Sequence, residues 1–349
     1  MKKLFNISAA LAIMLMARGL ASCSSNAEPE PAPEKTVEVT FKAQLPSRID
    51  ARAIADGTKA NELFFYVYDE NNNNIAALNR HNVAFDPTGE ASVTVALTAG
   101  HTYSFAFWAQ AKGVTVYDPS SASTVSLDYG SERKPVAGND DLRDAFYSLE
   151  KNVTVAADGT TVTRKIVLRR ALCQLNWAID PALVRQMKEA GVDIDGALVK
   201  VSVSKAYNRF GLLEGAPVQL DNYSQPTFDY ALQPAEQLTH IYDAASEDYK
   251  NFRWLAFDYF LTSTAQPSLI DARLTIKCLD GTVLGPYEVS NKKVQGNHRT
   301  NIILTGTLAE VHVNVVIDQD FDTTDNNVGA APAWKAAAGH HRLTHIERK

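Results

Sequence analysis

Apolar and polar residues alternate near the start of the chain, over residues 36 to 45. This period of two is typical of a strand with one buried face. Pro46 follows directly and ends the pattern. The apolar residues of the predicted buried face are Val37, Val39, Phe41, Ala43 and Leu45.

A polar segment with two basic residues follows this strand, from Ser47 to Ala53. Arg48 and Arg52 lie there among small neighbours, in a composition that stays exposed and open to a trypsin-like protease. We therefore hypothesise that the first strand packs on a core yet is removed by cleavage at Arg52 or Arg48. Its loss would leave an open sheet edge, which is a template for a strand from another copy. An ordinary N-terminal edge strand before an arginine-containing loop is the competing interpretation.

The first half of the chain then reads as short strands separated by turns. Asp158-Gly159 lies between two of these strands and predicts a β-hairpin. The expected strands cover residues 63 to 68, 91 to 97, 102 to 109, 151 to 156 and 161 to 168.

The second half continues in the same way but includes one convincing helix. Asp180 fits its N-cap, Pro181 its first position and Gly191 the position after its end. The expected strands cover residues 171 to 179, 198 to 205, 253 to 261, 272 to 279, 301 to 308 and 311 to 317.

Many short strands with one or two short helices indicate an all-β protein of two tandem antiparallel β-sandwich domains. This pattern argues against an α/β enzyme fold. The predicted division of the chain is a lipoprotein signal peptide (1–22), a disordered spacer (23–35), an N-terminal sandwich (36–170), a C-terminal sandwich (171–322) and a flexible tail (323–349).

The N-terminus has the pattern of a secretory signal. Two lysines precede a short apolar run, too short to span a membrane, that leads to Leu20-Ala21-Ser22-Cys23. These four residues resemble a lipobox, which predicts lipidation of Cys23 by acyl chains such as palmitate. Two or more chains give stable anchoring. The alternative is a simple secretion signal with a cysteine there by chance.

Charge and cysteine content narrow the function classes. The net charge of -6 and the absence of a basic stripe argue against nucleic-acid binding. Cys173 and Cys278 lie in apolar, strand-like runs, so two buried free thiols are expected. A single disulfide between Cys173 and Cys278 is the alternative, because their spacing in the sequence does not decide between the two states.

The sequence contains no motif that predicts an enzyme or a cofactor: no phosphate-binding glycine loop, nucleophile elbow or Cys-x-x-Cys pair occurs. No metal site is predicted either. The histidines His340, His341 and His345 fit a solvated tail, and carboxylate pairs such as Asp193 with Asp195 fit surface turns.

Three tryptophans offer a second functional interpretation. Trp108, Trp177 and Trp254 would form a sugar-stacking platform if they faced solvent. Each lies inside an apolar strand, which favours core packing. The basic pairs Arg164-Lys165 and Arg169-Arg170 fit solvated ends of strands.

Several runs together resemble the fimbrillin-like lipoproteins of the Bacteroides type, which belong to the type V pilin superfamily. The resemblance covers residues 37 to 322. The runs that carry it are Asp56–Leu63, Tyr66–Asp69, Phe105–Gln110, Asp141–Phe146, Arg170–Asn176 and Asn297–Ile302.

The resemblance implies two transthyretin-like sandwiches and a lipid-anchored precursor at the outer-membrane cell surface. It further implies that an arginine-specific protease removes the first strand and that pilin subunits then assemble by donating strands. Arg52 best matches the cleavage position and Arg48 is second. Expected partners are other pilin subunits or further copies, the membrane through the lipid, and surface ligands. The alternative is a lipid-anchored adhesin or glycan-binding module that does not polymerise.

Overall fold

The computed structural model describes residues 34–46, 57–129, 136–218, 227–231, 252–262 and 268–320. All elements named below belong to one compact unit that begins at Lys35. The predicted signal peptide, Cys23, the cleavage candidates Arg48 and Arg52, and the tail from residue 323 lie outside the described residues.

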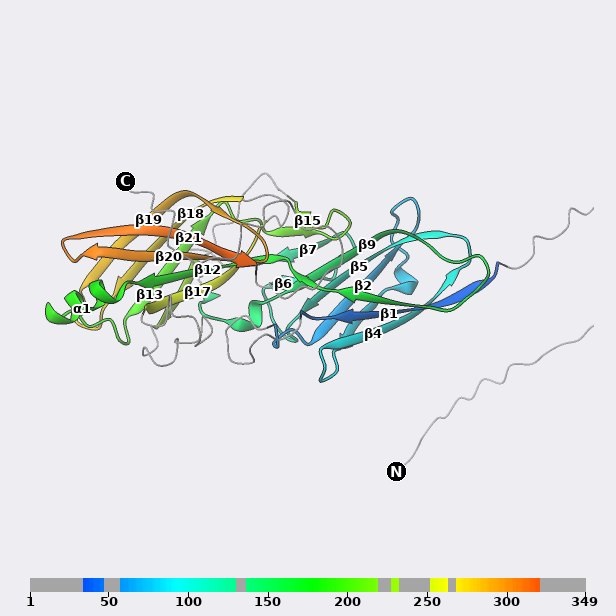
Figure 1. Cartoon of the computed structure of the whole chain (residues 1–349), viewed down its shortest axis with the longest axis horizontal. Coiled ribbons are helices and arrows are strands. Elements are labelled where there is room, and N and C mark those ends of the chain that lie inside the picture. Colours follow the sequence, from blue (N-terminus) through cyan, green and yellow to red (C-terminus); the bar gives the residue numbers. More distant parts are fainter. Residues whose placement is uncertain are drawn as a thin grey trace, which may run out of the picture. The chain divides into compact units, whose positions relative to one another are not determined.

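The protein is built mainly from β-strands, which confirms the predicted all-β fold class (Figure 1). In the first half, a three-stranded sheet in the order β10-β1-β4 packs on a five-stranded sheet in the order β11-β9-β5-β2-β3. The strands are β1 (Thr36–Gln44), β2 (Glu62–Tyr68), β3 (Arg80–Ala84), β4 (Glu90–Thr98), β5 (Thr102–Gln110), β9 (Phe146–Thr154), β10 (Val162–Val167) and β11 (Arg169–Arg170).

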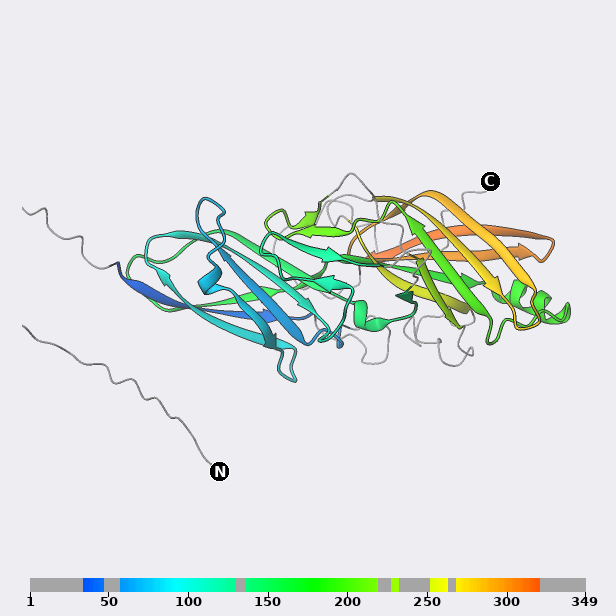
Figure 2. The same cartoon turned by 180° about the vertical axis from the view of Figure 1, so that it is seen from behind.

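The second half repeats this layering with two further sheets, in the orders β17-β12-β20-β21 and β19-β18-β13-β16-β8 (Figure 2). Their elements are β8 (Val136–Ala137), β12 (Leu172–Ile179), α1 (Pro181–Glu189), β13 (Leu198–Ser204), β16 (Thr227–Ala231), β17 (Arg253–Leu261), β18 (Ser268–Lys277), β19 (Val283–Val294), β20 (His298–Thr307) and β21 (Glu310–Asp320).

A small fifth sheet, in the order β15-β14-β7-β6, joins segments from both halves of the chain. Its strands are β6 (Tyr117–Asp118), β7 (Thr124–Leu127), β14 (Arg209–Gly211) and β15 (Ala216–Pro217), and the short 3-10 helices are η1 (Ala76–Leu78) and η2 (Asp141–Arg143).

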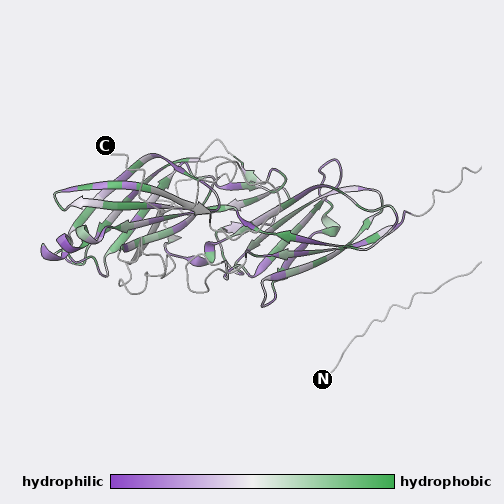
Figure 3. Ribbon diagram, in the orientation of Figure 1, coloured by the Kyte–Doolittle hydropathy of each residue, from purple (hydrophilic) through white to green (hydrophobic). Residues whose placement is uncertain are grey.

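Two apolar clusters form the core. One lies between β10-β1-β4 and the inner face of the five-stranded sheet. The other fills the second pair of sheets and extends to the opposite face of β2 and β5, where Trp108 lies 5.6 Å from Phe210 between ring centroids. β2 and β5 are therefore covered on both faces, which explains their almost continuous run of apolar residues. Figure 3 shows these apolar positions concentrated on the strands.

β1 and β12 have equivalent positions in their sheets, each between one antiparallel and one parallel neighbour. β1 lies between β4, which is antiparallel to it, and β10, which is parallel. β12 lies between β17, also antiparallel, and β20, also parallel. In both cases an early strand of the sandwich lies beside a late one, and the two run parallel.

The predicted hairpin at Asp158-Gly159 is wrong. The turn does form, because Asp158 Oδ1 accepts a hydrogen bond of 2.9 Å from the Thr160 amide and Gly159 has a φ of +80°. However, β9 pairs with β5 and β11, whereas β10 pairs with β1 in the other sheet. Local turn chemistry reverses the chain but does not choose the strand's partner.

The predicted helix is confirmed. The Asp180 carboxylate accepts a hydrogen bond of 2.7 Å from the Ala182 amide, and Pro181 opens the helix. Gly191 follows the helix with a φ of +75°, a left-handed conformation that favours glycine.

Candidate functional site

The alternation predicted for the first strand is confirmed. The side chains of Val37, Val39, Phe41, Ala43 and Leu45 are all buried. They belong to the cluster between the two sheets of the first sandwich.

β1 is not an edge strand. It pairs with β4 over all nine of its residues, from Thr36 opposite Thr98 to Gln44 opposite Glu90. On its other side, residues 39 to 44 pair with residues 162 to 167 of β10. Loss of β1 would therefore leave a slot between two strands, and the expectation of a single open edge is corrected. Sequence alternation reports which face is buried, but it does not report how many neighbours a strand has.

Phe41 is the largest side chain that β1 contributes to the core, and it is fully buried. Its ring contacts three aromatic rings of the facing sheet. The centroid distances are 5.4 Å to Phe65, 4.5 Å to Phe105 and 5.7 Å to Phe107. Tilted aromatic pairs at these distances are favourable beyond the apolar area they bury.

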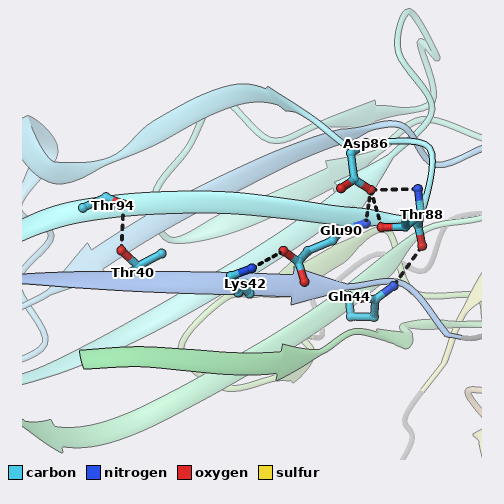
Figure 4. Close-up of polar contacts among 7 residues, drawn as sticks. All are labelled: Thr40, Lys42, Gln44, Asp86, Thr88, Glu90 and Thr94. Atoms are coloured by element: carbon cyan, nitrogen blue, oxygen red, sulfur yellow. Dashed lines mark hydrogen bonds and ion pairs between the residues drawn. The ribbon is translucent and has the colours of Figure 1, made fainter. Parts of the chain in front are cut away.

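The polar face of β1 contacts β4 and the turn before it (Figure 4). Thr40 and Thr94 share a hydrogen bond of 2.9 Å between their hydroxyls. The Lys42 ammonium donates to Glu90 Oε1 at 2.8 Å, and this hydrogen bond raises the pKa of Lys42. These half-exposed contacts align β1 on β4, but screening by solvent keeps each of them weak.

The turn that receives the end of β1 is organised by Asp86 (Figure 4). Its Oδ1 accepts hydrogen bonds from the Thr88 hydroxyl at 2.6 Å, the Thr88 amide at 2.8 Å and the Glu90 amide at 3.0 Å. The bond from the Thr88 side chain, with the amide bonds, lowers the pKa of Asp86. Gln44 Nε2 donates to the Thr88 carbonyl at 3.1 Å. Asp86 therefore holds the turn through contacts within the turn itself, and Gln44 adds one contact from β1.

Backbone hydrogen bonds hold both ends of β1. At its start, the Ala99 amide donates to the Lys35 carbonyl at 2.8 Å. At its end, the Leu168 amide donates to the Gln44 carbonyl at 2.9 Å, and the Leu45 amide donates to the Gly89 carbonyl at 3.0 Å. The chain then enters residues 47–56, where Arg48 and Arg52 lie, outside the described residues.

The tryptophans do not form a platform on the surface. Trp108, Trp177 and Trp254 are all buried, as core packing predicts.

Cys173 and Cys278 are buried free thiols, which is the expected state. Burial raises the pKa of Cys173 to about 12.

Arg170 corrects another prediction, because it is not a solvated strand end. It is buried, and its guanidinium holds the buried Asp144 carboxylate with Nε to Oδ1 at 2.9 Å and Nη2 to Oδ2 at 2.8 Å. The guanidinium also lies 4.9 Å above the centroid of Phe146. The pairing of β11 with β9 brings these side chains together, and the local sequence carries no signal of that pairing.

Within the described residues, no group of three or more histidine, cysteine, aspartate or glutamate side chains could hold a metal ion. Asp193 and Asp195 have structural contacts. Asp193 Oδ1 accepts a hydrogen bond from the Asp195 amide at 2.9 Å, and Asp195 forms an ion pair of 2.7 Å with Arg253.

Within the described residues, no helix has the length and apolar character to cross a membrane.

The chain is similar to several solved structures at low sequence identity. One is a candidate polysaccharide-binding protein (DUF1812) from Bacteroides thetaiotaomicron, with 12% identity, a TM-score of 0.47 and coverage of 83% of this chain and 100% of that one. A candidate cell adhesion protein from Bacteroides eggerthii has 12% identity, a TM-score of 0.47 and coverage of 83% and 98%. A C-terminally truncated tip fimbrial protein from Porphyromonas gingivalis has 14% identity, a TM-score of 0.41 and coverage of 81% and 99%.

No curated protein matches the chain. A family described as being of unknown function, DUF6562, matches residues 30–338, which is most of the chain. The chain therefore belongs to the family DUF6562.

Proposed function

We propose that this protein is a lipid-anchored structural or accessory subunit of a surface fimbrium, of the type V pilus kind, that assembles by strand exchange. Cleavage at Arg52, or at Arg48, detaches β1 from the rest of the chain. A strand supplied by another subunit then takes the place of β1 between β4 and β10.

The observation that carries this proposal is the position of β1. It is a single nine-residue strand at the start of the described chain, hydrogen-bonded on both sides and buried on one face. Its loss exposes two rows of backbone donors and acceptors that face each other. Such rows bind an added strand through main-chain hydrogen bonds.

Apolar burial provides the driving force for refilling the slot. Fully burying a valine, leucine or phenylalanine side chain stabilises by roughly 1.5–3 kcal/mol. β1 contributes two valines and Phe41 to the core, and Leu45 follows it. A donated strand with the same alternation regains this stabilisation, so completion of a core would hold the subunits together.

The anchor in this proposal is Cys23. The run Leu20-Ala21-Ser22-Cys23 supports cleavage before the cysteine and its lipidation. Two or more acyl chains would hold the precursor at the outer membrane until the first strand is removed.

Mass spectrometry of the N-terminus, on protein shed from intact cells and on protein retained by them, tests this proposal. We expect chains that start at Ala53 or Ile49 in high-mass assemblies. The control is the double variant Arg48→Lys with Arg52→Lys, which keeps both charges but removes the arginine sites. It should retain lipidated Cys23 and stay unassembled. If all wild-type chains are monomers that begin at lipidated Cys23, strand exchange is rejected in favour of a binding module that does not polymerise.

A further inference from the structure

We infer that the slot occupied by β1 selects its incoming strand by size at two positions: an aromatic side chain where Phe41 lies, and a residue no larger than alanine where Ala43 lies. The inference rests on the proposed strand exchange and adds the chemistry of the partner. That partner is a strand of a different protein chain with this pattern, and not a C-terminal segment of a second copy.

The aromatic requirement follows from what surrounds Phe41. Phe65 of β2 and Phe105 and Phe107 of β5 all lie within 5.7 Å of its ring centroid. These three rings belong to the sheet that remains when β1 is removed. A smaller side chain at this position would leave a cavity beside them, and cavities in a packed core are destabilising.

The size limit follows from Ala43. This residue is fully buried, opposite the buried Ala91 of β4 on one side and the buried Ile166 of β10 on the other. A larger side chain there requires its neighbours to move, which a packed core resists.

Strand direction and charge restrict the partner strand further. An incoming strand that runs in the direction of β1 lies antiparallel to β4 and parallel to β10, and so restores both existing ladders. Lys42 lies between Phe41 and Ala43 in the sequence, and its ammonium forms an ion pair of 2.8 Å with the Glu90 carboxylate. A donor with a basic residue at that position retains this contact.

The two C-terminal segments of this chain fit poorly. The inward residues of β21 would be Val311, Val313, Val315 and Ile317, without an aromatic side chain at any position. In the tail, Trp334-Lys335-Ala336 repeats the order of an aromatic, a basic and a small residue seen in β1. An alignment of Trp334 with Phe41 places Pro332 at the position of Val39. Val39 has partners on both neighbouring strands, and a proline at this central position would remove a backbone N–H donor from the sheet.

A competition experiment tests the inference on the full chain, with a sequence-specific protease site in place of residues 47–52. After cleavage, a fluorescent peptide of residues 36–46 is allowed to exchange into the slot, and unlabelled peptides compete with it. The competitors are the native peptide, its Phe41→Ala, Phe41→Trp, Ala43→Leu and Glu38→Gln variants, and peptides of residues 309–319 and 330–340.

Phe41→Ala should weaken competition roughly a hundredfold or more, since such truncations in a core lose about 3–5 kcal/mol. Ala43→Leu should weaken it roughly tenfold, as overpacking does. Phe41→Trp should weaken it less than Phe41→Ala does. Glu38 is exposed, so Glu38→Gln is the matched control and should compete like the native peptide.

The outcomes separate this inference from the proposed function. If the native peptide never exchanges into the cleaved, folded protein, the proposed function fails. If the native peptide exchanges but Phe41→Ala competes equally well, only the inference fails. Equal competition by either C-terminal peptide would also overturn it, because a second copy would then suffice as donor.

Discussion

At the scale of single residues, alternation along β1 predicted burial correctly, whereas the environment of Arg170 was not predictable. A period of two is a local property of one strand, so the sequence displays it directly. The partner of Arg170 is Asp144, which lies 26 residues away and becomes a neighbour only through the pairing of β9 with β11. The sequence does not encode that proximity in any local pattern.

This buried pair predicts a large effect of mutation. Arg170→Ala leaves the Asp144 carboxylate buried without its guanidinium and should lower the free energy of unfolding by about 3–5 kcal/mol. The matched control is Arg273→Ala, because Arg273 and Glu288 form an ion pair of 3.5 Å with both side chains more than half exposed. Its effect should stay within about 0.5 kcal/mol. Denaturant unfolding of both variants measures the difference, and equal shifts would contradict the assigned role of Arg170.

Cys173 predicts a pH dependence of stability on the alkaline side. Burial raises its pKa from the ordinary value of 9.0 to about 12, so between these values the folded state keeps a proton that the unfolded state releases. The contribution of Cys173 is present below pH 9. As pH rises through the window, it falls by roughly 1.4 kcal/mol per unit.

Urea unfolding of the wild type and of Cys173→Ala at pH 8 and pH 10.5 isolates this contribution, because both proteins share every buried tyrosine. The stability advantage of the wild type should shrink at the higher pH. An advantage that is the same at both values would show that the Cys173 pKa is not raised.

At the scale of elements, the sequence predicted where strands begin and end better than it predicted which strands pair. Asp158-Gly159 has the turn chemistry of a hairpin, yet the chain crosses there from one sheet to the other. β10 instead pairs with the side of β1 that does not face β4. Strand pairing is therefore decided by contacts distant in sequence, which local signals do not report.

The central place of β1 predicts its hydrogen-exchange behaviour. Amides of β1 are enclosed by ladders on both sides, whereas β10 forms the outer strand of this sheet in the described part of the chain. In the uncleaved protein, the amides of residues 39 to 44 should therefore exchange more slowly than those of residues 162 to 167. Exchange measured by mass spectrometry at peptide resolution checks this. Equal protection of the two strands would contradict the central position of β1.

At the scale of the whole described unit, the two apolar clusters have different relationships to β1. The cluster between β10-β1-β4 and the facing sheet depends on β1, whereas the other cluster contains no residue of β1. Removal of the first strand should therefore open one core and leave the other intact. This separation makes a subunit with an open slot physically reasonable.

The most direct test of strand exchange is hydrogen exchange on the chain that begins at Ala53, with and without a peptide of residues 36–46. The account predicts rapid exchange in β4 and β10 without the peptide, protection of both strands after its addition, and slow exchange in β12 and β20 in either case. A chain from Ala53 that is monomeric, protects β4 and β10 without the peptide and binds none of it would contradict the account.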